Sequence, residues 1–325
     1  MKHIIFGESH GNAIGITIEN PPAGVKLDWD FINSEMARRA PGNSPLSTPR
    51  KEADAVEVLS GVFEGRTTGT PLTAIIRNEN TKSKDYAQLK DLPRPSHGDF
   101  SGFVRYGGCA DYRGGGHFSG RLTAPLVFGG ALAKLILQEK GIQVAAEISM
   151  IGGTANPTPE EMAEIILQAR SEKDSVGGAV RCAITGLPAG CGAPDFGCNV
   201  EGIIAQYLFA VPAVKAIAFG AGFQLAAMRG SEANDAFILE EEQIKTATNH
   251  AGGVNGGITN GMPVTFEVAF RPTPSIARPQ QTVSLSRMEE ATLEIHGRHD
   301  PCIVPRAVVV VEAAAALAAC TVLGI

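Results

Sequence analysis

Apolar residues recur along the chain at two spacings, which predict a mixture of α-helices and β-strands. Residues 159–172 show the helical spacing most clearly, because Thr158 can cap the helix and Pro159 suits its first turn. Similar runs predict further helices at 29–40, 122–140, 199–209 and 312–323. Shorter apolar runs predict strands at 54–63, 71–77, 143–151, 178–186, 214–222, 263–270 and 307–311.

Two of the predicted helices, at 122–137 and 312–323, are apolar around nearly their whole circumference. Such helices must be covered on both sides, which a layer of helices between β-sheets would achieve. The second helix lies in the longest apolar stretch, 307–325, and a membrane anchor is an alternative explanation of that stretch. Glu312 and the abundance of alanine and valine favour a buried strand and helix instead.

A short pattern occurs twice in the chain. Residues 65–73 and 257–265 both read G-x-T-x-G-x-P-apolar-T, and both run into a predicted strand. The pattern indicates either a duplicated turn-and-strand unit, with one copy in each half, or a coincidence of turn chemistry.

Composition and charge predict one continuous soluble domain, residues 1–325. The 38 glycines and 20 prolines are spread through the chain, and no low-complexity linker divides it. The net charge of −6 argues against nucleic acid as a partner, because non-specific binding needs a basic surface. The N-terminus does not resemble a signal peptide, and the six cysteines form no CxxC pair. We therefore expect reduced thiols, a cytoplasmic location and no membrane association.

Residues 94–121, RPSHGDFSGFVRYGGCADYRGGGHFSGR, carry the most chemical information. Their glycines allow the backbone to approach a ligand closely, and their arginines suit phosphate or carboxylate. This segment therefore predicts a site for an anionic small molecule. His97 and Asp99 could be an acid–base pair or metal ligands, but the histidine and cysteine spacings fit no common zinc site, so we expect no metal.

Three further segments contain candidate functional residues. His10, in GESHG after a short strand, could protonate a leaving group or could simply bond to nearby backbone. The basic segment 38–52 could clamp an anion or form a solvated loop. Asp300 stands between a histidine and a proline near Arg298, where a neighbouring cation would keep it ionised as a base or as one side of a structural ion pair.

Seven short motifs follow one another from Phe6 to about Leu317, in the order GESHG, RR-x-PG, LSGVFEG, RPSH-x-D, YRGGG, GG-x-NGGI and GRHDPC. As an ordered set they resemble the chorismate synthase family. The resemblance implies the release of phosphate from 5-enolpyruvylshikimate 3-phosphate to give chorismate. It also implies a need for reduced FMN without net redox change, an α+β fold with helices sandwiched between two antiparallel β-sheets, and a homotetramer.

The resemblance also implies roles for individual residues. His10, His97 and Asp300 match the family's catalytic positions. The positions that match substrate-binding residues are Arg39, Arg50, Ser119, Arg121 and Arg298. The positions that match flavin-binding residues are His117, Ser119, Ala213, Gly256, Arg271, Thr273, Ser275 and Arg298.

The chain departs from the family pattern at several positions. Pro45 stands where the family usually has an arginine, His117 replaces the arginine of GGGR, and Leu122 replaces a glutamate. Arg271 replaces a lysine and keeps its charge. The three proposed catalytic side chains remain, so we expect an active enzyme. A flavin-binding paralogue without lyase activity and a non-catalytic scaffold are the alternatives.

Overall fold

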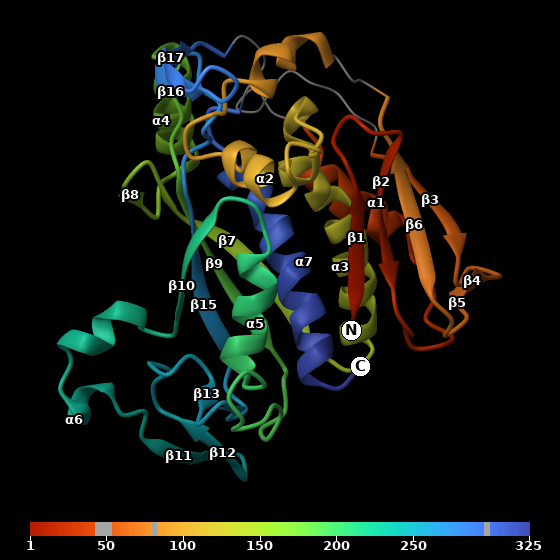
Figure 1. Ribbon diagram of the computed structural model, residues 1–325. Coiled ribbons are helices and arrows are strands. Elements are labelled where there is room, and N and C mark those ends of the chain that lie inside the picture. The colour runs from red at the N-terminus through yellow and green to blue at the C-terminus, as the bar shows by residue number, and fades with distance from the viewer. Residues whose placement is uncertain (43–53, 80–82, 296–299) are drawn as a thin grey trace.

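Two antiparallel β-sheets form the outer layers of the protein. The computed structural model describes residues 1–42, 54–79, 83–295 and 300–325 (Figure 1). One sheet has four strands, in the order β1 (His3–Gly7), β2 (Ala13–Ile18), β6 (Leu72–Arg77) and β3 (Val56–Ser60). The other has five, in the order β10 (Val214–Phe219), β15 (Val264–Phe270), β9 (Gly178–Thr185), β7 (Gln143–Ile151) and β8 (Thr154–Ala155).

Four helices lie between the sheets, as Figure 1 shows. They are α1 (Trp29–Arg39), α3 (Thr123–Gln138), α5 (Val200–Phe209) and α7 (Val304–Val322). Helix α3 packs on β2 and β6, whereas α7 packs on β7 and β9. The predicted α+β sandwich with a helical middle layer is confirmed.

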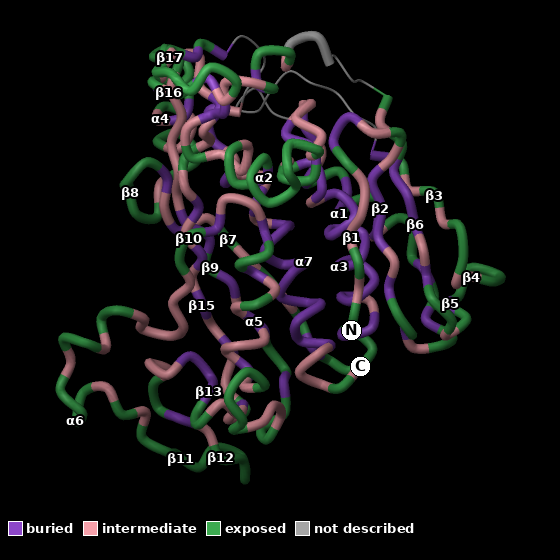
Figure 2. Tube along the Cα trace, viewed as in Figure 1, coloured by how far each residue is buried: buried purple, intermediate pink, exposed green. Residues whose placement is uncertain are grey.

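The centre of the middle layer is the contact between α3 and α7. Gly130 permits the close approach, because a Cβ there would lie 2.2 Å from the Cβ of Ala313. Helix α7, and α3 together with the turn before it (Gly120–Gln138), are long and apolar enough to cross a membrane, but the two apolar windows are 89% and 78% buried within the protein (Figure 2). They are therefore core helices, as the sequence predicted for the stretch after 307.

Charged groups inside this core are paired. Lys134 of α3 donates to Glu35 of α1 and to Glu312 of α7, and Arg38 donates to both carboxylates. Burial would raise the pKa of Glu312, but Arg38 and Lys134 outweigh it and lower that pKa. The network therefore joins three helices without leaving an uncompensated buried charge.

The repeated sequence pattern is a repeated structure. Thr67 accepts a hydrogen bond from the amide of Val25 and donates to the carbonyl of Pro22. In the second half, Thr259 accepts from the amide of Cys191 and donates to the carbonyl of Pro188. Each threonine thus ties its turn to a Pro-Ala-Gly segment.

The duplication extends to the order of the elements. The series β1, β2, α1, β3, β6, α3 in the first half corresponds to β7, β9, α5, β10, β15, α7 in the second. In both halves the final strand pairs with the second and fourth elements of the series, and the final helix enters the middle layer. Equivalent connections of the two halves therefore share one end of the sandwich.

The sequence prediction was wrong at 307–311, which is helix rather than strand. It also lacked β2, the helix at 99–105 and the hairpins at 237–246 and 280–293. Helix α7 begins at Val304, with Pro305 in its first turn, because complete burial in the middle layer outweighs the strand preference of valine. The predicted caps of α4 are confirmed, since Thr158 and Glu161 form a capping box. The remaining elements are β4 (Val62–Phe63), β5 (Arg66–Thr67), η1 (Ser83–Lys90), α2 (Asp99–Arg105), η2 (Arg113–Phe118), η3 (Gly120–Leu122), α4 (Pro159–Ser171), η4 (Gly222–Ala227), α6 (Gly230–Ala233), β11 (Phe237–Glu240), β12 (Gln243–Thr246), β13 (Val254–Asn255), β14 (Ile258–Thr259), β16 (Gln280–Ser284) and β17 (Glu289–Leu293).

Candidate active site

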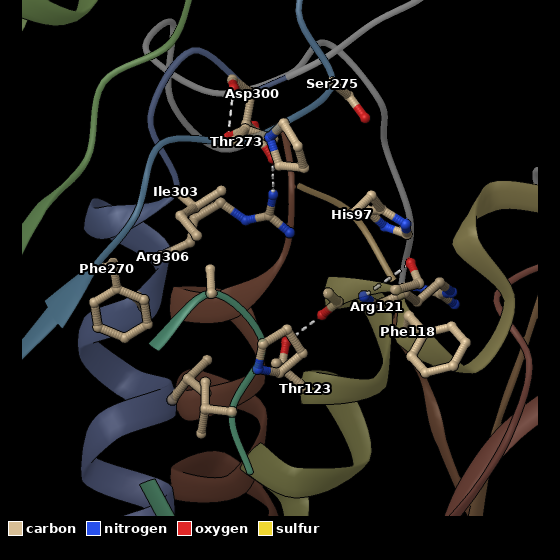
Figure 3. Close-up of a pocket in the computed structure, with 18 of the residues that line it drawn as sticks. His97, Phe118, Arg121, Thr123, Phe270, Thr273, Ser275, Asp300, Ile303 and Arg306 are labelled. Carbon is tan, nitrogen blue, oxygen red and sulfur yellow. Dashed lines mark hydrogen bonds and ion pairs between the residues drawn. The ribbon is translucent and has the colours of Figure 1, made fainter. Parts of the chain in front are cut away.

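A cavity of about 280 Å³ lies where equivalent connections of the two halves meet. The β6–α3 connection and the end of α1 line it from the first half. The α5–β10 and β15–α7 connections line it from the second. Figure 3 shows side chains from both halves turned toward the same space.

The lining is strongly cationic. Five described lining residues are arginines, and Asp300 is the carboxylate among them. Asp54 and Asp99 contact three of these arginines from behind. Cations therefore exceed carboxylates, which suits a ligand with several negative charges. The arginines are Arg39, Arg94, Arg121, Arg271 and Arg306.

Asp54 orients two of the arginines. Its side chain is wholly buried, and it accepts from Arg39 through Oδ2 and from Arg121 Nη1 through Oδ1 at 2.7 Å. Arg121 is fixed further by Asn78, whose Oδ1 accepts from Nε at 2.6 Å. The two guanidinium groups are thus positioned before any ligand arrives, which lowers the entropy cost of binding.

A turn of three glycines lies directly against the rings of the two candidate catalytic histidines. Gly114, Gly115 and Gly116 all have positive φ, at 60°, 83° and 53°. A Cβ on Gly114 would lie 2.5 Å from the His10 ring, and one on Gly115 would lie 3.2 Å from the His97 ring. Glycine is therefore required here both by backbone conformation and by space.

His10 is buried beside the cavity rather than on its wall. Its ring lies 5.0 Å from the ring of Tyr86, measured between centroids. Tyr86 and Gly114 both line the cavity. His97 is itself a lining residue, and burial lowers its pKa, although the carboxylate of Asp99 partly opposes that shift.

Asp300 is paired with a cation that the sequence analysis did not single out. Arg306 Nη1 donates to Asp300 Oδ2 at 2.6 Å, and Arg306 Nε donates to the carbonyl of Arg39 at 2.9 Å. Burial lowers the pKa of Arg306, and the nearby Arg39 lowers it further. Arg306 therefore connects the candidate base to the end of α1.

Four of the predicted flavin-binding residues of the second half line the same cavity, namely Ala213, Arg271, Thr273 and Ser275. Ala213 adopts a positive φ of 73°, and its carbonyl accepts from the amide of Arg271 at 3.0 Å. Thr273 Oγ1 donates to the carbonyl of Asp300 at 3.1 Å. Ser119 of the first half also lines this cavity.

The structure does not bring every predicted residue to the cavity. His117 is exposed, and its Nδ1 lies 3.0 Å from the carbonyl of Gly7. Gly256 lies in the exposed turn between β13 and β14, away from the residues that line the cavity. Arg50, Arg298 and Pro45 lie outside the described residues.

The sequence analysis missed several residues of the site. Asp54, Tyr86, Arg94 and Arg306 were not predicted, although Arg94 begins the RPSHGD motif. Leu122, which replaces a usual glutamate, is buried in the core. In the part of the chain that the structure describes, no three histidine, cysteine, aspartate or glutamate side chains are grouped to hold a metal ion.

Comparisons with known proteins agree on one family. A model of chorismate synthase matches residues 1–323. A chorismate synthase of Thermococcus kodakarensis is 46% identical over 330 residues, covering 96% of this chain and 92% of that protein. One of Methanothermobacter thermautotrophicus is 44% identical, covering 96% of this chain and 89% of that protein. A crystal structure of chorismate synthase is similar at 27% identity with a TM-score of 0.73, covering 98% of this chain and 89% of the other.

Proposed function

The chain belongs to the chorismate synthase family, and from that premise we propose how its cavity performs the family's reaction. The function is that of a phosphate-eliminating lyase of the shikimate pathway, which supplies aromatic amino acid biosynthesis. The family converts 5-enolpyruvylshikimate 3-phosphate to chorismate and uses reduced FMN.

Arg39 and Arg121 bind the substrate's phosphate or carboxylates in this proposal. The substrate carries a phosphate and two carboxylates, and FMN adds another phosphate. Two unit charges 4 Å apart interact by about 4 kcal/mol at an effective dielectric constant near 20, so like-charged ligands need a cationic lining. The five arginines around one cavity are the single observation that carries the proposal.

The second-half wall fits a flavin. Phe270, Ile303 and Val310 supply apolar surface for a planar ring system. Arg271, with Thr273 and Ser275, supplies the polar groups that would hold its substituents. When bound, reduced FMN would supply electron density for breaking the carbon–oxygen bond without net oxidation.

In this proposal, three side chains of the protein transfer protons or control protonation. His10 gives a proton to the departing phosphate, because it is buried beside the cavity and a histidine can change charge near neutral pH. Asp300, beside the cation of Arg306, serves the removal of the substrate hydrogen. His97 adjusts the protonation of the bound cofactor.

We also propose that residues 1–325 act as one domain, in the cytoplasm, within a homotetramer. One core cluster containing side chains from both sheets and the middle layer supports the single domain. The hairpin of β11 and β12 supports assembly, because one face exposes Phe237, Leu239 and Ile244. Exposed apolar faces of this kind commonly pack against another subunit.

An anaerobic assay tests the proposed function. The protein is mixed with reduced FMN and 5-enolpyruvylshikimate 3-phosphate, and phosphate and chorismate absorbance are followed together. We expect equal amounts of both products, and slower phosphate release from His10→Ala. Flavin binding without measurable substrate binding would instead favour a flavin-binding paralogue that lacks lyase activity.

A further inference from the structure

Behind His97 lies a buried cluster in which one carboxylate takes part in four hydrogen bonds. Oδ1 of Asp99 accepts from Arg94 Nη2 at 2.8 Å and lies 2.6 Å from His97 Nδ1, within hydrogen-bond distance. Oδ2 accepts from Arg94 Nε at 2.7 Å and from the Arg94 amide at 3.0 Å. The side chains of all three residues are at least 88% buried, with exposed fractions of 6% for Arg94, 12% for His97 and 7% for Asp99.

This arrangement assigns the tautomer of His97. A carboxylate that also faces a bidentate guanidinium is ionised and can only accept, so the proton of this hydrogen bond resides on Nδ1. Arg94 Nη2 lies 3.1 Å from the same nitrogen, and both groups direct their protons at Asp99 Oδ1. Nε2 of the neutral ring is therefore left as the acceptor.

The same arrangement excludes Asp99 as a base for the substrate. An ionised carboxylate has about four lone-pair positions, and four donors already occupy them. Burial alone would raise the pKa of Asp99, but the hydrogen bonds from Arg94 and His97 outweigh it and hold the pKa below its ordinary value. Asp99 therefore acts on the cavity only through its neighbours.

We infer that Asp99 and Arg94 are positioning residues for His97, which fix its ring so that any proton it exchanges in the cavity moves at Nε2. This inference rests on the proposed function and deepens it. Arg94 Nη1 also donates to Ser275 Oγ at 3.1 Å, so the cluster connects His97 to a lining residue of the second half. Asp99, Arg94 and the neighbouring Arg271 are the charged groups that act on the ring.

A double-mutant cycle tests whether Asp99 acts through His97. Turnover is measured anaerobically for the wild type, His97→Ala, Asp99→Asn and the double variant. We expect Asp99→Asn to lower turnover at least about tenfold, and the double variant to match His97→Ala within about twofold. Effects that multiply in the double variant would overturn the inference.

Asp174→Asn is the matched control. Asp174 pairs with Arg278 at 2.6 Å on the surface, outside the cavity, so its loss should leave turnover unchanged. A wild type that releases no phosphate would count against the proposed function. An active wild type with multiplicative effects would count against the inference alone.

An NMR measurement of the His97 tautomer tests the inference even if Asp99→Asn does not fold. The nitrogen shifts of the seven histidines are recorded in the 15N-labelled wild type, with His97 assigned by its absence in His97→Ala. We expect Nδ1 protonated and Nε2 unprotonated above the pKa of the ring, and a mixed tautomer in Arg94→Lys. A proton on Nε2 in the neutral wild-type ring would overturn the inference.

Discussion

Arg121 donates a 2.7 Å hydrogen bond from Nη1 to Oδ1 of Asp54, whose side chain has no exposed surface. The two residues lie 67 positions apart, and the other oxygen of the same carboxylate accepts from Arg39. One buried acid thus sets the separation of two arginines that we propose bind the substrate.

Asp54→Asn should therefore weaken both substrate binding and stability. Removing the charge leaves two buried guanidinium groups without their common partner, and breaking a buried pair costs about 3–5 kcal/mol. We expect KM for the substrate to rise at least tenfold and the melting temperature to fall. Glu57→Gln is the control, because the ion pair of Glu57 with Arg77 is half-exposed and should contribute little. Equal effects of the two substitutions would contradict the role of Asp54.

Gly114→Ala should abolish most of the activity. The new Cβ would lie 2.5 Å from the His10 ring, so the proposed proton donor must move. Gly107→Ala separates this collision from backbone strain, because Gly107 has a similar φ of 57° and no atom within 4 Å of its Cβ position. We expect turnover to fall more than tenfold at 114 and to change little at 107. Similar turnover in the two variants would show that the position of the His10 ring against Gly114 is not needed for activity.

Gly130→Ala should destabilise the protein without touching the cavity. The added methyl group would overlap Ala313 across the α3–α7 contact, and overpacking of this kind costs about 1–3 kcal/mol. Gly230→Ala is the control, since its Cβ would meet no atom within 4 Å. Urea unfolding should show a lower free energy of unfolding for the first variant only. An unchanged value for Gly130→Ala would contradict close packing of the two core helices.

The acid sensitivity of the fold should depend on Asp99. Because the native pKa of Asp99 lies below its ordinary value, its contribution is fully present above about pH 4 and is lost as pH falls toward the native pKa. The wild type should therefore exceed Asp99→Asn in melting temperature most at pH 7, with the gap narrowing below about pH 4. A gap that stayed constant from pH 7 to pH 3 would show that the native pKa of Asp99 is not lowered.

Local sequence signals predicted most of the strands and helices of the sandwich, whereas burial decided the segment at 307–311. The capped helix at 159–172 and the alternating strand at 263–270 have patterns that match their final environment. The valines at 308–311 favour a strand locally, yet they form a helix in which the middle layer buries Val309, Val310 and Val311. No local pattern contains that constraint, because it comes from the two sheets.

The same contrast between local sequence signals and contacts formed on folding explains which residues of the site were predicted. The motifs predicted residues that line the cavity, such as Arg121 and Thr273. They did not predict the residues that hold these groups, because Asp54 and Arg306 acquire their roles through contacts formed only on folding. His117 shows the converse, since a motif position predicted a cavity contact and the ring instead lies against the carbonyl of Gly7.

We propose that the arginine-lined cavity eliminates phosphate and that Asp300 serves the removal of the substrate hydrogen there. The anaerobic turnover of Asp300→Asn tests this proposal, measured together with its affinity for FMN and with the exposed control Asp195→Asn. We predict nearly unchanged FMN affinity and turnover lowered at least about tenfold, which corresponds to about 1.4 kcal/mol of barrier. Turnover equal to that of the wild type would contradict the account.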